Sequence, residues 1–148
     1  MPVEVLVNAD ALAESCDPGL EPLLVRAVQA AAAAHEVGVG ELSLTLLGDE
    51  GIAELNQRFI GHEGPTDVLA FALFEAGEVP VGDIYLGYDQ ALRQAQEHDV
   101  PLAQELARLA VHGTLHVLGE DHPAGAERTT SAMWLLQERI VSDLFSPA

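Results

Sequence analysis

Lysine is absent from this chain of 148 residues, and its six basic residues, all arginine, face twenty-four acidic ones, which gives a formal net charge of −18. Proteins that hold nucleic acid mainly by charge carry the opposite balance, because they neutralise backbone phosphates with basic side chains. The composition therefore excludes broad electrostatic capture of a polyanion. A polyanionic substrate would have to be held by local positive charge, by a metal ion or by a partner that delivers it.

Cysteine is nearly absent as well. Cys16 stands alone, so one chain can form neither an internal disulfide nor a cysteine-based metal site. The alanine run at 30–34 is too short to span a bilayer, and the N-terminus lacks the basic and then apolar pattern of a secretory signal. We therefore expect a cytoplasmic protein with no membrane partner.

Aromatic residues make up only 5% of the chain against a hydrophobic fraction of 49%, so the core is expected to consist mostly of Leu, Val, Ile and Ala. The length suits one domain, 1–148. Periodicity and turn residues predict a mixed α+β fold, in which a small mixed sheet of about four strands is covered by helices. The expected strands are 3–7, 41–47, 68–73 and 84–86, the last two forming a hairpin, and the expected helices are 22–37, 49–60 (capped by Asp49), 88–97, 101–118 and 126–144.

Three of the six histidines fall at the end of the apolar helical pattern 101–118, spaced H-x3-H-x5-H. His112 and His116 lie one helical turn apart on the same face, with Cβ atoms roughly 5–6 Å from each other. Gly119 can end the helix in a left-handed conformation, which lets His122 turn back toward the pair. Three imidazoles with one open position are typical of a catalytic zinc site, so we expect one Zn²⁺ per chain.

A structural interpretation competes with the metal site. The helix is apolar almost all round, and a lone histidine on such a helix is more often a hydrogen-bonded core residue than a ligand. However, two imidazoles buried on one face without a shared partner would be costly. The combination of three histidines at these two spacings therefore favours a metal site.

The pattern H-E-x-x-H-x-x-G-x-x-H of metzincin proteases matches the three histidines and Gly119, but Gly113 stands in place of the catalytic glutamate. Peptide hydrolysis of that type needs the carboxylate as general base and acid, so protease activity is not expected. Cleavage of RNA depends less on a protein carboxylate, because the 2′-hydroxyl of RNA lies beside the phosphodiester bond and a metal can neutralise charge on the phosphoryl oxygens.

The histidine segment 112–122, His-Gly-x-Leu-His-x-Leu-Gly-x-Asp-His, resembles the signature of the YbeY family of rRNA-maturation endoribonucleases. Residues 65–71, Pro-Thr-Asp-Val-Leu-Ala-Phe, are similar to that family's P-T-D-V-L-S-F segment, and Leu-Asn at 55–56 and Gly-Asp-Ile at 82–84 match two shorter elements. The resemblance implies a zinc-hydrolase-like fold and a metal-dependent endoribonuclease that prefers single strands. It also implies a role in small-subunit rRNA maturation and ribosome quality control, with rRNA and ribosomal proteins as partners.

The resemblance also suggests two further site residues and one departure. Ile60 stands where the family carries an arginine, and Arg58, two places earlier, is the candidate for contact with substrate phosphate. Asp83 of the Gly-Asp-Ile element is the candidate catalytic carboxylate near the metal water. Glu120 and Asp121 are either solvated turn residues or carboxylates that orient a ligand histidine through its outer nitrogen.

Two other functions stay open. A zinc hydrolase of a peptide or small molecule would need a carboxylate base that the motif lacks. A non-catalytic, zinc-stabilised ribosome-binding protein would close the fourth position with a protein ligand. The coordination sphere distinguishes these, since an exchangeable fourth position favours an enzyme.

Overall fold

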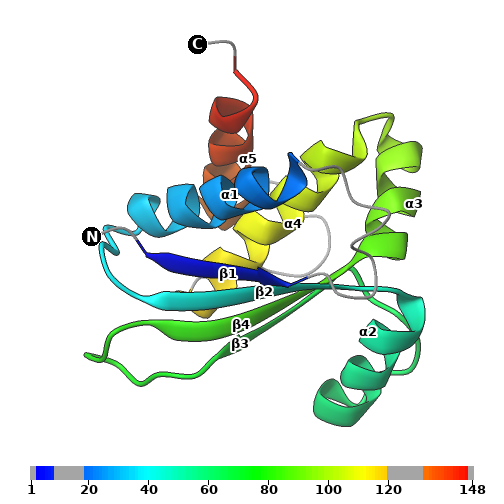
Figure 1. The fold of residues 1–148 in the computed structure, drawn as a ribbon, viewed down its shortest axis with the longest axis horizontal. Coiled ribbons are helices and arrows are strands. Elements are labelled where there is room, and N and C mark those ends of the chain that lie inside the picture. The colour runs from blue at the N-terminus through cyan, green and yellow to red at the C-terminus, as the bar shows by residue number, and fades with distance from the viewer. Residues whose placement is uncertain (1–2, 9–18, 120–131, 147–148) are drawn as a thin grey trace.

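The computed structural model describes residues 3–8, 19–119 and 132–146 (Figure 1). It contains four strands, five α-helices and one π-helical segment in these residues. In chain order they are β1 (Glu4–Asn8), α1 (Leu20–Ala34), β2 (Glu41–Leu47), α2 (Asp49–Leu55), η2 (Asn56–Ile60), β3 (Val68–Ala72), β4 (Val81–Gly87), α3 (Tyr88–His98), α4 (Leu102–Val117) and α5 (Ala132–Leu144).

The strands form one mixed sheet in the order β1-β2-β4-β3. β1, β2 and β4 run parallel, and β3 pairs antiparallel with β4, with Val68 opposite Leu86. The predicted pairing of the third and fourth strands and the predicted α+β class are therefore confirmed. β3 lies at one edge of the sheet, so its outer side offers backbone groups that no neighbouring described strand pairs.

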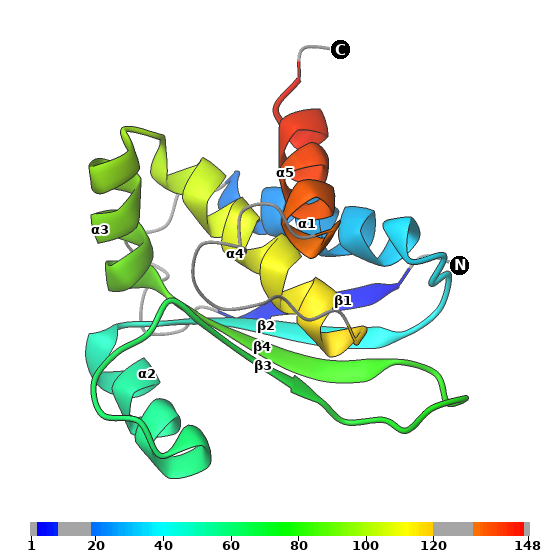
Figure 2. The ribbon, with the colours of Figure 1, turned by 180° about the vertical axis from the view of Figure 1, so that it is seen from behind.

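The two faces of the sheet have different surroundings. Leu42, Leu44 and Leu46 of β2 are buried, whereas Ser43 and Thr45 between them are half-buried, as strand alternation requires. Figures 1 and 2 show α1, α4 and α5 on one side of the sheet, and α2, which η2 continues, on the opposite side. The leucines lie on the first side, because Leu44 pairs with Ile84, which packs against Gly113 of α4. The core therefore lies between one face of the sheet and three helices, with Leu24, Leu106 and Leu115 among its fully buried residues.

α4 runs through the middle of this core and contacts α1, α3, α5, β3 and β4. Two glycines permit its close approach to the sheet. A Cβ on Gly113 would lie 2.8 Å from the Cγ2 atom of Ile84, and a Cβ on Gly82 would lie 2.6 Å from the Cγ1 atom of Val117. Both distances are shorter than carbon atoms tolerate, so glycine sets the helix-to-sheet spacing here.

The second helix differs from expectation at both ends. Gly48, not Asp49, precedes its first turn as the N-cap. The backbone N–H of Asp49 donates to the carboxylate of Asp89 instead (2.9 Å), while Arg93 binds the Asp49 carboxylate and lowers its pKa. At the other end the helix continues to Ile60, as predicted, but as the π-helical segment η2.

Cys16 and the predicted start of the last helix, before Ala132, lie outside the described residues. Within the described ranges, no helix combines the length and apolar character needed to cross a membrane.

Candidate metal centre

The last two turns of α4 bring two imidazoles together, as the spacing predicts. The Nε2 atoms of His112 and His116 are 3.1 Å apart, and the ring planes are inclined by 76°. Two nitrogens bound at 2.0–2.1 Å to one tetrahedral zinc would be about 3.4 Å apart. The pair is therefore within a few tenths of an ångström of the geometry that one cation needs.

A glutamine of α5 holds the first of these rings. The Nδ1 atom of His112 lies 2.5 Å from Oε1 of Gln137, and both side chains are buried. Because a carbonyl oxygen can only accept, Nδ1 carries the proton and donates it. The neutral ring then directs its Nε2 lone pair toward His116, which is the tautomer that a metal ligand requires.

The orientation of the Gln137 amide is itself fixed by its neighbours. Its Nε2 group donates to Glu138 (3.0 Å), so Oε1 must be the atom facing His112. Glu138 in turn accepts from the Nε and Nη2 atoms of Arg108 at 2.9 and 3.1 Å. Arg108 also donates to the buried carboxylate of Glu105 (3.0 Å). A charge-assisted network across α4 and α5 therefore anchors the histidine from behind.

In front of the histidines lies a cavity of about 490 Å³, between α4 and the edge strand. His112 and His116 form one wall. The other wall consists of Val68, Leu69, Ala70 and Ala72 of β3, together with Asp67, which directly precedes that strand. The site is therefore accessible from the sheet edge, and Asp67 is the carboxylate that shares the cavity with the histidine pair.

Gly113, between the two histidines, faces the sheet. Its hydrogen atoms take the place where a side chain would meet Ile84 and Val68, at 2.8 and 3.2 Å. A glutamate at this position would be forced into the β-sheet. The close packing of α4 on the sheet therefore explains why glycine stands where a metzincin protease has its catalytic glutamate.

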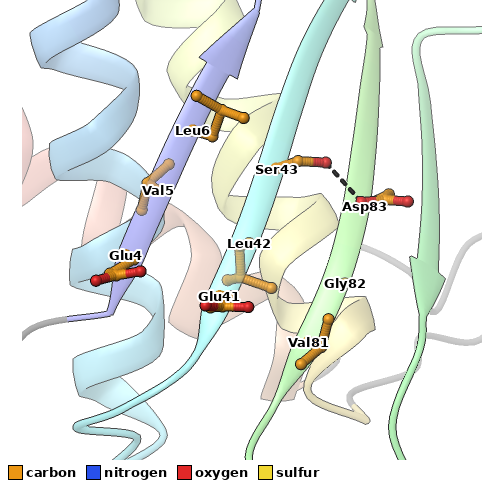
Figure 3. A pocket seen from close by; sticks show the side chains of 9 residues that line it. All are labelled: Glu4, Val5, Leu6, Glu41, Leu42, Ser43, Val81, Gly82 and Asp83. Carbon is orange, nitrogen blue, oxygen red and sulfur yellow. Dashed lines mark hydrogen bonds between the residues drawn. The ribbon is translucent and has the colours of Figure 1, made fainter.

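Two other predicted site residues, Asp83 and Arg58, do not line the histidine cavity. Asp83 is on β4, between Gly82 and Ile84, and therefore on the sheet face opposite α4. Its carboxylate accepts a hydrogen bond from Ser43 (2.6 Å), and it lines a cavity of about 500 Å³ together with Glu4 and Glu41 (Figure 3). The structure does not bring Asp83 to the histidines, which argues against its predicted role beside the metal water.

Arg58 is exposed on η2, with its guanidinium carbon 5.8 Å from the centre of the Phe59 ring. It is not among the residues that line the histidine cavity. Ile60, at the position where an arginine was expected, is also exposed on η2. Neither residue is placed in the wall of the site, so Arg58 as a substrate contact stays a prediction that concerns the approach to the site.

The third predicted ligand, His122, and the two turn carboxylates, Glu120 and Asp121, lie outside the described residues. Within 3–8, 19–119 and 132–146, no three histidine, cysteine or acidic side chains are grouped closely enough to hold an ion. The described part of the site thus consists of two imidazoles, their anchor Gln137 and the cavity carboxylate Asp67.

Gln137 and Asp67 are the site residues that the sequence interpretation missed. The sequence signal for Asp67 was its place in the Pro-Thr-Asp segment at 65–67, directly before an expected strand. Gln137 gave no comparable signal, because its role depends on the packing of α5 against α4.

Together, the mixed α+β fold and a histidine pair that opens on a cavity define the class of a candidate metal-dependent enzyme. Comparison with known proteins specifies the family. The family model of endoribonuclease YbeY matches residues 9–145, and the chain belongs to that family.

Curated relatives and a solved structure agree with this assignment. Endoribonuclease YbeY of Moorella thermoacetica is 49% identical over 115 residues, covering 70% of this chain and 74% of its own. Endoribonuclease YbeY of Brevibacillus brevis is 37% identical over 147 residues, covering 88% and 91%. The solution structure of TM1509 from Thermotoga maritima superposes with a TM-score of 0.61 at 28% identity, covering 95% of this chain and 89% of that one.

Proposed function

We propose that this member of the family is a zinc-dependent endoribonuclease that cleaves single-stranded rRNA during small-subunit maturation and ribosome quality control. Family membership supports the endoribonuclease activity. The observation that carries the metal dependence is the converging pair His112 and His116, with the donor tautomer of His112 fixed by Gln137.

In this proposal, His112, His116 and His122 hold one zinc ion. When bound, zinc supplies Lewis acidity toward phosphoryl oxygens and a water molecule whose pKa falls to about 7. The residues of the site fit such an ion, because neutral imidazole nitrogens are ordinary zinc ligands and the cavity in front of them can admit a substrate group.

Asp67 is the described carboxylate best placed to move a proton in this cavity. It is half-buried, and it lines the cavity together with both histidines. A carboxylate there can accept the proton of the attacking hydroxyl and return it to the leaving oxygen. We therefore assign to Asp67 the acid–base role that the sequence had suggested for Asp83.

A peptide substrate is disfavoured by the packing of Gly113, which leaves no room for the carboxylate of a metzincin-type protease. A non-catalytic ribosome-binding role is disfavoured by the cavity that leads to the histidines. The proposal includes the cytoplasm as location and the ribosome, or a small-subunit protein, as the partner that presents the RNA, since the −18 charge provides little attraction of its own.

The proposal is tested with purified protein and three RNA substrates: free single-stranded rRNA, the same segment in a duplex, and the same segment within the small subunit. We expect cleavage of single strands that a chelator abolishes and that is faster in the ribosomal particle than in solution. Arg58→Ala should slow cleavage if that residue contacts phosphate. Chelator-resistant cleavage, or a preference for the duplex, would contradict the proposal.

A further inference from the structure

We propose that the open face of the sheet beside η2 is a stacking platform for the bases of single-stranded RNA. The platform consists of Phe59, Phe71 and Tyr85, which we call the aromatic row, with Arg58 at its end. The inference rests on the proposed function, since it names the surface that leads RNA to the histidine cavity.

The aromatic row joins three separate elements. The ring centres of Phe59 (η2) and Phe71 (β3) are 5.7 Å apart, and those of Phe71 and Tyr85 (β4) are 6.0 Å apart. Both pairs are in edge-to-face contact, with interplanar angles of 66° and 72°. Mutual contacts of this kind hold the rings in fixed positions, so a base that stacks on them requires little additional ordering.

The aromatic row concentrates the few aromatic residues of this chain. The sequence has seven (four Phe, two Tyr and one Trp), and three of them form the row. Phe59 is 59% exposed, while Phe71 and Tyr85 are half-buried. α1, α4 and α5 cover the other face of the sheet (Figures 1 and 2). The rings are therefore accessible on the side where, among the described helices, only α2 and η2 lie.

Arg58 places a positive charge beside Phe59, at the end of the aromatic row, where a phosphate of bound RNA can pair with it. Its guanidinium lies 5.8 Å from the Phe59 ring centre, whereas Arg93 and Arg108 bind Asp49 and Glu138. A guanidinium beside an exposed ring can stack on a base and also contact the adjoining phosphate. On the platform, Arg58 would bind RNA without lining the histidine cavity.

β3 connects the row with the candidate metal centre. Phe71 points to the open face, while its neighbours Ala70 and Ala72 line the histidine cavity on the other side of the same strand. Because β3 is the edge strand, a nucleic-acid strand that leaves the row can pass around this edge into the cavity. Bases held on one face would thus bring a phosphodiester to the histidines on the other.

Charge on the open face directs phosphates to one end of the aromatic row. Glu4 of β1 and Glu41 of β2 are acidic, and Asp83 of β4, which accepts a hydrogen bond from Ser43, is the cross-strand partner of Phe71 (Figure 3). Phosphates would be repelled by these carboxylates and accepted at the Phe59 end of the row, beside Arg58. Stacking on aromatic rings needs no phosphate neutralisation, so it is the mode of RNA binding that an acidic chain can use.

The test measures binding of a fluorescent single-stranded RNA of about ten nucleotides by anisotropy, with metal-loaded protein at several salt concentrations; the probe carries 2′-O-methyl and phosphorothioate groups so that it keeps its charge and is not cleaved. Phe59→Leu and Phe71→Leu keep apolar bulk but remove the ring. We expect each to weaken binding about tenfold, and an abasic strand of the same length to bind no better than the variants do to RNA. The control Leu6→Ala removes an exposed apolar residue of β1 and should leave binding unchanged.

The salt dependence separates stacking from charge. Each neutralised phosphate contributes about −0.7 to the slope for a single strand, so we expect a slope of roughly −1 to −2, made shallower by Arg58→Ala. Wild-type affinity in both ring variants, or equal binding of the abasic strand, would overturn the platform. A change of sedimentation mass in Phe59→Leu would also overturn it, since the face would then be an interface between copies.

Failure of the platform can be distinguished from failure of the proposed function. Ring-independent binding together with chelator-sensitive cleavage would overturn the platform and leave the endoribonuclease intact. Ring-dependent binding without metal-dependent cleavage would support the platform and contradict the catalytic proposal. Circular dichroism and zinc content of each ring variant, expected to equal those of the wild type, exclude misfolding as the cause of lost binding.

Discussion

The two faces of the sheet differ in their surroundings, and in the proposed function this difference separates metal chemistry on one face from substrate contact on the other. The covered face packs against α4, whose two histidines meet at 3.1 Å beside β3. The open face carries the aromatic row, in which Phe59 is exposed, together with the acidic side chains of Glu4, Glu41 and Asp83, the last of which is the cross-strand partner of Phe71. Burial fixes the tautomer and position of the proposed ligand His112 on the first face, whereas the second face leaves ring surface accessible to a flexible polymer.

Strand alternation places adjacent residues on opposite faces of the sheet. Gly82 and Asp83 are adjacent in the chain, yet Gly82 makes room for Val117 of α4 while Asp83 accepts a hydrogen bond from Ser43 on the other side. In β3, Phe71 and Ala70 divide in the same way between the aromatic row and the histidine cavity. A short motif on a strand therefore contributes to two surfaces, and its residues need not share a role.

The largest effect is expected on the covered face. His112→Ala, His116→Ala and His122→Ala each remove one proposed ligand, so each should lower zinc occupancy from about one per chain to a small fraction and abolish RNA cleavage. Metal analysis after dialysis against a weak chelator checks the prediction. His98→Ala, an exposed histidine on α3, is the control that should keep its zinc. Full occupancy in all three variants would remove the metal centre from this account.

The next prediction compares the effect on kcat of removing one carboxylate from each face of the sheet. Asp67→Asn removes the proton acceptor of the histidine cavity and should lower kcat by about 10²–10⁴-fold, the usual contribution of a general acid or base. Asp83→Asn should leave kcat within a few-fold, because Asp83 lies on the opposite face. Both variants should retain zinc. A large loss of kcat in Asp83→Asn with none in Asp67→Asn would reverse the assignment.

Gln137 tests how the covered face holds its ligand. Gln137→Leu removes the acceptor of the His112 Nδ1 proton, so zinc affinity should fall about 10–100-fold, as for other residues that orient metal ligands. Competition with a fluorescent chelator measures the affinity, and nitrogen NMR of the imidazole should show the loss of the single tautomer. Gln29→Leu, which removes a side-chain amide hydrogen bond from α1 to the carbonyl oxygen of Val3, outside the network that anchors His112, should not change the affinity.

The smallest effect concerns the spacing of α4 and the sheet. Gly113→Ala places a Cβ 2.8 Å from Ile84, and the resulting overpacking costs about 1–3 kcal/mol, partly offset by the roughly 1 kcal/mol gain in helix propensity. Gly51→Ala is the matched helical control, because its Cβ would make ordinary contacts with Leu47 at 3.5 Å, and it should stabilise the protein. Urea unfolding measures both. Equal stabilisation by the two substitutions would show that α4 does not pack as described.

Local sequence signals predicted much of this structure, and the exceptions have physical causes. Apolar periodicity indicated the helices and strands, and the helical spacing indicated that His112 and His116 meet. The side of the sheet on which Asp83 lies could not be predicted, because alternation assigns residues to opposite faces without showing which face α4 covers. Gln137 was missed because its contact with His112 joins two residues that are twenty-five positions apart and lie on different helices, and only the packing of α5 against α4 brings them together.

The central claim is that one zinc ion held by the histidines is needed to cut RNA and cannot serve to cut peptide bonds. The most direct test is to strip the protein of metal, titrate zinc back, and follow cleavage of single-stranded rRNA and of casein in parallel. RNA cleavage should rise and saturate at about one zinc per chain, in proportion to occupancy, while casein stays intact. RNA cleavage by the fully stripped protein, or zinc-dependent cleavage of casein, would contradict the account.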